Sequence, residues 1–166
     1  MSIDKAVAMD MQDTARGRGA VGARAVVPRV IKRDLSPAEA GRVLDFGCGE
    51  TQRHVKSLRA EGYEVYGHDF GVNELYKYQA GWDTVYASNV LNVQPNKQVL
   101  RETLETLKSL MDEDTTLIAN YASSPRKAGL YVRELREILE KHFKSIERVK
   151  LNSNIIWELK GAVNYV

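Results

Sequence analysis

Two glycines separated by one residue, Gly47 and Gly49, follow the run Arg42–Phe46 and its acidic member Asp45. Glycine allows positive backbone φ angles and lets a ligand approach without meeting a Cβ atom. The polar residues after Gly49 are typical of a helix start, where free N–H groups and a partial positive charge attract phosphate, carboxylate or ribose oxygens. The spacing therefore predicts a ligand-binding turn between a strand and a helix.

A second acidic residue, Asp69, lies about twenty positions after the glycines, at the end of the strand-like run at 63–70. An acid at that interval is placed to accept hydrogen bonds from both hydroxyls of a ribose. Strand, glycine turn, helix, strand and acid together make a βαβ nucleotide-binding unit. We therefore expect Asp69 and the glycine turn to form one site.

The remaining elements position this site by alternating helices with strands. We predict helices at 23–35, 36–39, 51–62, 98–111 and 130–143, and strands at 42–46, 63–70, 83–87, 115–121, 145–151 and 155–160. Residues 73–81 are predicted as a short helix or a loop, and Asn152–Asn154 as the turn of a terminal hairpin. This order predicts an α/β fold with a Rossmann-like, doubly wound, mostly parallel sheet and a C-terminal antiparallel hairpin strand.

Helical periodicity also predicts which side chains face the core. In the helix at 51–62, we expect Val55 and Leu58 to face inward and His54 to face solvent. The inner face of the helix at 130–143 is predicted to carry Tyr131, Leu135, Ile138 and His142.

The composition limits the class of protein. The chain has 166 residues, of which 43% are apolar and 28% charged, as expected of a folded domain. Its net charge of +2 does not by itself indicate a nucleic-acid binder. The single cysteine, Cys48, excludes an internal disulfide and a multi-cysteine metal site. Because no apolar run reaches membrane-spanning length, a cytoplasmic protein is expected. No metal site is expected.

The N-terminal region is basic. Residues 1–20 are predicted to be a flexible arm carrying Arg16 and Arg18, and residues 21–166 a single domain. In the first helix, basic residues fall among the apolar ones at Arg24, Arg29, Lys32 and Arg33. These are either a solvated helix face or, together with the arm, a basic flap that meets an anionic substrate.

The segment Val43–Gly49 resembles the first motif of class I S-adenosylmethionine-dependent methyltransferases, and Asp69 matches the ribose-binding acid of that family. Trp82–Val93 resembles the family's fourth strand and the loop after it, and the resemblance extends over about residues 40–160. The segment Arg16–Val93 also resembles small methyltransferases of phages and bacterial DNA-modification clusters.

The resemblance implies S-adenosylmethionine as cofactor. It implies that the loop 46–49 passes under the methionine and ribose, that Asp45 orders the loop or binds the methionine amino group, and that Phe70 lies beside the adenine. The implied cofactor-binding residues are Asp45, Phe46, Gly47, Cys48, Gly49, Asp69, Phe70, Ser88, Asn89 and Val90. Candidates for a catalytic role are Asn89, Asn92 and Tyr121.

The sequence departs from the family pattern in three places. Thr51 stands where the family often has a third glycine. The interval from Asp69 to Asp83 is so short that the usual third strand and its helix must be shortened or absent. Ser88–Leu91 replaces the Asn/Asp-Pro-Pro-aromatic motif of enzymes that methylate exocyclic amines of DNA bases.

Three functional interpretations remain open. The first is an active methyltransferase whose acceptor is a small molecule or a nucleic acid held by the basic arm. The second is a non-catalytic cofactor-binding module that acts through a protein partner, which the absence of an obvious general base favours. The third is a nucleotide-dependent oxidoreductase on a Rossmann sheet, which is disfavoured because Gln52 interrupts the Gly-x-Gly-x-x-Gly pattern.

Overall fold

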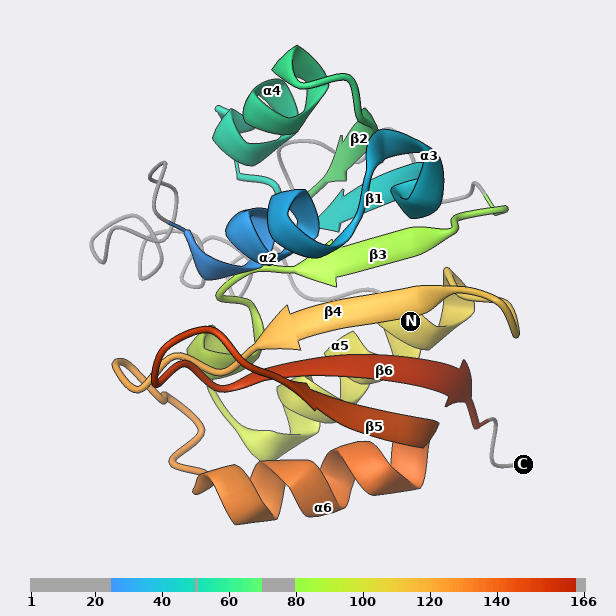
Figure 1. Cartoon of the computed structure of the whole chain (residues 1–166). Coiled ribbons are helices and arrows are strands. Elements are labelled where there is room, and N and C mark those ends of the chain that lie inside the picture. The colour runs from blue at the N-terminus through green and yellow to red at the C-terminus, as the bar shows by residue number, and fades with distance from the viewer. Residues whose placement is uncertain (1–24, 50, 70–79, 164–166) are drawn as a thin grey trace.

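The computed structural model describes residues 25–49, 51–69 and 80–163. Six strands form one sheet in the order β2-β1-β3-β4-β6-β5 (Figure 1). Their bounds are β1 (Arg42–Phe46), β2 (Glu64–His68), β3 (Thr84–Ala87), β4 (Thr116–Asn120), β5 (Phe143–Val149) and β6 (Ile156–Ala162). The first four strands pair in parallel, and β6 runs antiparallel to both β4 and β5. The predicted α/β fold, with its mostly parallel sheet and antiparallel C-terminal strand, is confirmed.

Helices cover both faces of this sheet. One face carries α2 (Val26–Asp34), α3 (Pro37–Ala40) and α4 (Arg53–Ala60), and the other carries α5 (Lys97–Ser109) and α6 (Val132–His142) (Figure 1). A 3₁₀ turn, η1 (Leu91–Val93), precedes α5. A capping box starts α3, as the helix predicted at 36–39 requires: the Glu39 N–H donates to Ser36 Oγ at 3.1 Å, and the Ser36 N–H donates to Glu39 Oε1 at 3.0 Å.

Neighbouring residues of β1 pack on opposite faces of the sheet. Val43 belongs to the core cluster of α2 and α4, whereas Leu44 and Phe46 belong to the cluster of α5 and α6. A strand that is covered on both faces has an almost continuous apolar sequence. The glycine turn therefore starts from a rigid, buried strand.

Two predicted orientations are wrong. Tyr131 is 76% exposed because it precedes the first residue of α6 in extended conformation, and Leu139 joins Leu135 in the core instead. His54, in the first turn of α4, is buried together with Val55 and Leu58, so the buried face of this helix is wider than the predicted one.

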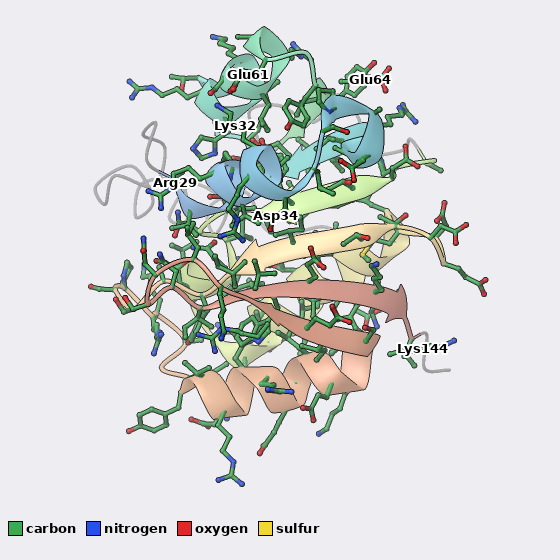
Figure 2. The ribbon with its side chains drawn as sticks, viewed as in Figure 1. Arg29, Lys32, Asp34, Glu61, Glu64 and Lys144 are labelled. Atoms are coloured by element: carbon green, nitrogen blue, oxygen red, sulfur yellow. The ribbon has the colours of Figure 1, made fainter. Side chains whose placement is uncertain are left out.

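The basic residues of α2 have different surroundings. Lys32 forms an ion pair with Glu61, the residue after α4, and Arg33 pairs with its neighbour Asp34 (Figure 2). These two cations are therefore already paired with acids inside the fold. Arg29 is half-buried and lies on the side toward which β1, β3 and β4 point.

The ends of the chain and of the second strand limit what the structure tests. Arg16, Arg18 and Arg24 lie outside the described residues, so the flexible arm at 1–20 and the single domain at 21–166 stay predictions. β2 forms one edge of the sheet, and the described residues between His68 and Thr84 contain no regular strand or helix. Residues 70–79, where a short helix or loop is predicted, are outside the described ranges.

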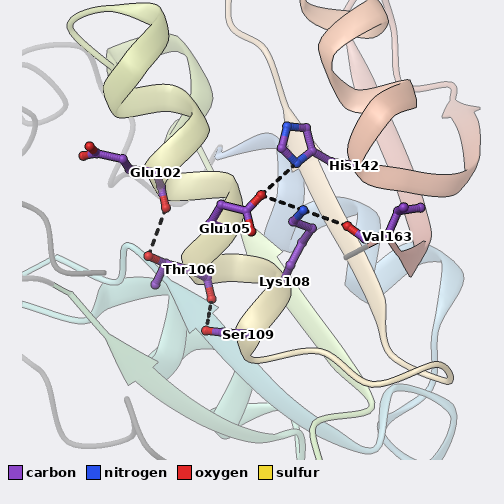
Figure 3. A network of polar contacts seen from close by, with 7 residues as sticks. All are labelled: Glu102, Glu105, Thr106, Lys108, Ser109, His142 and Val163. Carbon is purple, nitrogen blue, oxygen red and sulfur yellow. Dashed lines mark hydrogen bonds and ion pairs between the residues drawn. The ribbon is translucent and has the colours of Figure 1, made fainter. Parts of the chain in front are cut away.

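A polar network closes the C-terminal part of the fold (Figure 3). The buried Lys108 Nζ lies 2.7 Å from Glu105 Oε1 and donates to the Val163 carbonyl at 2.8 Å. His142 Nδ1 lies 3.4 Å from the same Glu105 oxygen, and the Val163 N–H donates to the His142 carbonyl at 2.8 Å. Burial, reinforced by the Lys108 cation, lowers the pKa of His142. The network therefore joins α5 to the ends of α6 and β6.

Removing the Glu105 carboxylate should destabilise the fold, because the buried Lys108 ammonium would lose its charged partner. We expect Glu105→Ala to lower the free energy of unfolding by about 1–3 kcal/mol in urea denaturation, since the buried ammonium would lose a charged hydrogen-bond partner that is itself half-exposed. Lys108→Met keeps the aliphatic volume and should be nearly neutral. In the Lys108→Met background, Glu105→Ala should cost clearly less; an equal cost in both backgrounds would refute the pairing.

Candidate active site

The candidate site lies where β1, β3 and β4 end. Their arrowheads point to the same edge of the sheet, and α2 begins near that edge (Figure 1). In open α/β sheets, ligands bind just outside the carboxyl ends of the strands. The segments that follow these three strands begin at Gly47, Ser88 and Tyr121.

The glycine turn is fastened to the end of β2. The N–H groups of Gly47 and Cys48 donate to the His68 carbonyl at 2.7 and 3.1 Å. Gly47 has φ +89°, and a Cβ atom there would lie 2.7 Å from Val90 Cγ2. Gly49 has φ +74°, and no described atom lies within 4 Å of the position that its Cβ would take. The turn is thus closely packed at Gly47 and open at Gly49.

Asp69, the acid at the end of the second strand, is hydrogen-bonded to the open end of this turn. Its Oδ2 accepts a hydrogen bond from the Gly49 N–H at 2.8 Å, and the side chain is buried at the end of β2. The predicted association of Asp69 with the glycines therefore exists in the fold. Its neighbour Phe70 lies outside the described residues.

Asp45 lies beneath the turn as a fully buried carboxyl group. The Tyr86 hydroxyl donates to its Oδ2 at 2.8 Å, and its Oδ1 has no hydrogen-bond partner among the described residues. Burial raises the pKa of Asp45 to about 8; the Tyr86 hydrogen bond opposes this shift, and the negative charge of Asp69 adds to it. At neutral pH the carboxyl is therefore mostly protonated. Buried groups with such shifts are concentrated at ligand-binding and catalytic sites.

The ends of β3 and β4 are held together by two asparagines. The Asn89 N–H donates to Asn120 Oδ1 at 2.7 Å, and Asn120 Nδ2 donates to Asn89 Oδ1 at 3.0 Å. Asn89 has φ +56°, a left-handed conformation that asparagine tolerates better than most residues. Beside it, Ser88 Oγ is buried without a hydrogen-bond partner among the described residues. Asn120 was not predicted as a site residue; its position at the end of a parallel strand was the available signal.

Asn92 and Tyr121 both hold the segment 121–131. Asn92 Nδ2 donates to the Pro125 carbonyl at 3.1 Å, while its Oδ1 is buried without a partner in the described part of the chain. The Tyr121 hydroxyl donates to the Leu130 carbonyl at 2.6 Å, and Arg126 lies 4.3 Å above its ring. Burial raises the pKa of Tyr121, so its phenol stays protonated. A catalytic role for either residue stays a prediction.

The described residues contain no group of three His, Cys, Asp or Glu side chains placed to hold a metal ion. No helix in the same ranges is long and apolar enough to cross a membrane.

A glycine turn and an acid at adjacent strand ends of a doubly wound sheet define a Rossmann-like nucleotide-binding protein. Residues 21–153 match the family model described as a methyltransferase domain. The chain therefore belongs to the class I S-adenosylmethionine-dependent methyltransferases, and S-adenosylmethionine is its cofactor. This family excludes the oxidoreductase interpretation.

Solved structures share the fold at low sequence identity. Magnesium protoporphyrin IX methyltransferase from Synechocystis PCC 6803, with bound S-adenosylmethionine, has a TM-score of 0.56 and 22% identity over 98% of this chain and 86% of its own. A TehB-like methyltransferase from Corynebacterium glutamicum has a TM-score of 0.59 and 15% identity over 96% of this chain and 100% of its own. An O-methyltransferase family protein from Burkholderia thailandensis has a TM-score of 0.58 and 9% identity over 96% of this chain and 60% of its own.

The search of curated proteins found no significant match. The resemblance to class I methyltransferases is confirmed by the family model, whereas an association with phages or DNA-modification clusters receives no support.

Proposed function

We propose that this chain transfers a methyl group from S-adenosylmethionine to an acceptor held at the ends of β3 and β4, either a small molecule or a nucleic acid. The observation that carries the proposal is the 2.8 Å hydrogen bond from the Gly49 N–H to Asp69, next to the open space at Gly49. It joins the loop expected under the ribose to the acid expected to bind the ribose hydroxyls.

The chemistry of the residues present fits the cofactor. The open position at Gly49 leaves room against the backbone, and Asp69 offers a carboxylate to the ribose hydroxyls. Two buried oxygens without partners among the described residues, Asp45 Oδ1 and Ser88 Oγ, are available to polar ligand groups at the same edge. When bound, S-adenosylmethionine supplies a methyl group that its sulfonium already activates for in-line attack.

The chain's own contribution is then orientation of the acceptor. The reciprocal bonds between Asn89 and Asn120 fix the ends of β3 and β4 relative to each other. Asn92 Oδ1, a buried acceptor without a described partner, is the group best suited to take a hydrogen bond from an N–H or O–H of the substrate. Asn92 is our preferred positioning residue, because the hydroxyl of Tyr121 is already bonded to Leu130.

Gly49→Ala and Gly129→Ala make a matched pair that tests whether the space at Gly49 belongs to the cofactor. Both glycines have φ near +70°, and neither Cβ position has a described atom within 4 Å. Each substitution should therefore destabilise the empty protein by a similar amount, about 1 kcal/mol, from backbone strain alone. In isothermal titration, only Gly49→Ala should weaken S-adenosylhomocysteine binding, by about tenfold or more, equivalent to about 1.4 kcal/mol. Equal affinities of the two variants would refute this use of the space.

A non-catalytic module acting through a protein partner is the second candidate, because Asn89 and Tyr121 already use their polar groups inside the fold. The two candidates are separated by incubating the protein with methyl-labelled S-adenosylmethionine and a cell extract fractionated into RNA, DNA, protein and small molecules. We expect label in one fraction above the Asp69→Ala background. If the protein binds S-adenosylhomocysteine normally but no fraction becomes labelled, the proposed methyl transfer would be refuted and the non-catalytic module supported.

A further inference from the structure

Exposed acids gather at one edge of the sheet and basic side chains around the other, although Lys144 and Lys160 lie at the acidic edge. Around the carboxyl edge, basic side chains occur on the start of α2, the starts of α5 and α6, the segment after β4 and the hairpin turn. We call Arg29, Lys97, Arg126, Lys127, Arg133 and Lys150 the basic rim. The opposite edge carries exposed acids in the segments that lead into the parallel strands, at Glu39, Glu64, Asp83, Asp112, Glu113 and Asp114.

The topology produces this separation. Parallel strands end at one edge and begin at the other, so the segments that follow and precede them collect on opposite sides. Figure 2 shows Arg29 on the side of the strand ends and Glu64 and Lys144 on the opposite side. A cleft of about 410 Å³ at the opposite edge is lined by Glu39, Asp83, Asp114 and Glu158, with Lys160 as its cation. The small net charge of +2 therefore hides an uneven distribution of charged side chains over the surface.

The segment 121–131 is held in one conformation on the rim. The Tyr121 hydroxyl bonds the Leu130 carbonyl, Asn92 Nδ2 bonds the Pro125 carbonyl, and the Lys127 N–H donates to the Asn92 carbonyl at 3.0 Å. These bonds reduce the loss of conformational freedom when a ligand is bound.

Tyr131 ends this segment and is 76% exposed. Within the described ranges it is the one large apolar side chain that faces solvent. Its N–H donates to Glu134 Oε1 at 3.1 Å, so this acid, the nearest in sequence to the rim, is engaged by the backbone. Arg133, two residues further on, has a side chain that is 90% exposed and lies 3.5 Å from Glu137 Oε1, which is itself exposed.

We propose that the basic rim and Tyr131 bind single-stranded nucleic acid and present it to the methyl-transfer site. Lysine and arginine side chains pair with phosphates, and an exposed aromatic ring stacks on an unpaired base. A small anion would need one cation cluster, whereas this rim extends over five separate segments. This inference rests on the proposed function for the location of the transfer site.

Fluorescence anisotropy with a labelled 15-nucleotide single strand, as RNA and as DNA, tests the proposal without cofactor. The rim variant is Lys97→Glu/Arg133→Glu; both residues lie in the first turn of a helix, where an acidic side chain is favoured and folding should be retained. The matched control, Lys144→Glu/Lys160→Glu, makes the same change in net charge with exposed residues of β5 and β6.

We expect wild-type binding that weakens steeply with salt, because bound phosphates release counterions. The rim variant should bind at least tenfold more weakly, and the control should stay within about twofold of wild type. Tyr131→Ala should lose about fivefold or more, from the loss of one stacked base. Equal losses in the two charge variants, or no binding at low salt, would overturn the proposal.

A parallel titration with S-adenosylhomocysteine separates this proposal from the proposed function. Normal cofactor binding without nucleic-acid binding would refute nucleic acid as the acceptor and would leave the proposed methyl transfer standing. Nucleic-acid binding without cofactor binding would instead overturn the proposed function.

Discussion

Asp69→Ala should raise the dissociation constant for S-adenosylhomocysteine about 100-fold, because at least two charge-assisted hydrogen bonds of a buried carboxylate would be lost. The carboxylate also accepts the Gly49 N–H, so its removal would release the open end of the glycine turn. Isothermal titration of both proteins with the same ligand measures the difference.

Asp83→Ala is the matched control for this variant. Asp83 Oδ2 accepts the Arg42 N–H at 2.8 Å, the same type of contact and distance, but at the opposite end of β1. Asp83→Ala should leave the affinity for S-adenosylhomocysteine unchanged. Asp69→Asn, which retains an oxygen for the Gly49 N–H and loses the charge, should fall between wild type and Asp69→Ala. Unchanged binding by Asp69→Ala would remove Asp69 from the cofactor site.

Asp45→Asn should stabilise the empty protein at pH 8 while weakening the binding of S-adenosylhomocysteine. The folded-state pKa of Asp45 is about 8, whereas the ordinary value is 3.8. Between these values the unfolded chain ionises and the folded chain does not, so the stability contributed by Asp45 falls as the pH rises and is constant above about 8. Asparagine resembles the protonated carboxyl and does not ionise, so Asp45→Asn removes this loss of stability at high pH.

Urea denaturation at several pH values measures this effect. The stability of Asp45→Asn relative to wild type should increase by on the order of 2 kcal/mol between pH 5 and pH 7. Because the contribution of His142 is present in both proteins, it cancels in the comparison. A difference that does not vary with pH would show that Asp45 is ionised in the fold. Loss of ligand affinity in the more stable variant would identify Asp45 as a functional residue with a cost in stability.

The fold was largely predictable because its signals are local. The apolar run before Gly47, the periodicity of α5 and the capping box at Ser36 depend on residues close together in sequence. The wrong orientation of Tyr131 has a local cause as well: α6 begins at Val132, two residues after the predicted start, so Tyr131 precedes the helix. Helix ends are the least certain part of such patterns.

The site was predictable only in part, because several of its contacts join distant strands. Asp45 and Tyr86 meet through the pairing of β1 with β3, and Asn89 meets Asn120 through the pairing of β3 with β4. No spacing in the sequence pairs Asn120 with Asn89 or indicates the raised pKa of Asp45. The separation of charge between the two edges also requires the topology, since the net charge is close to zero.

Isothermal titration with S-adenosylmethionine and S-adenosylhomocysteine, with NAD as the control, tests the central claim most directly. The glycine turn with Asp69 predicts micromolar binding of both sulfur ligands and no binding of NAD, with affinity lost in Asp69→Ala and kept in Asp83→Ala. Absence of binding by both sulfur ligands, or equal binding by the two aspartate variants, would contradict a cofactor site at this edge of the sheet.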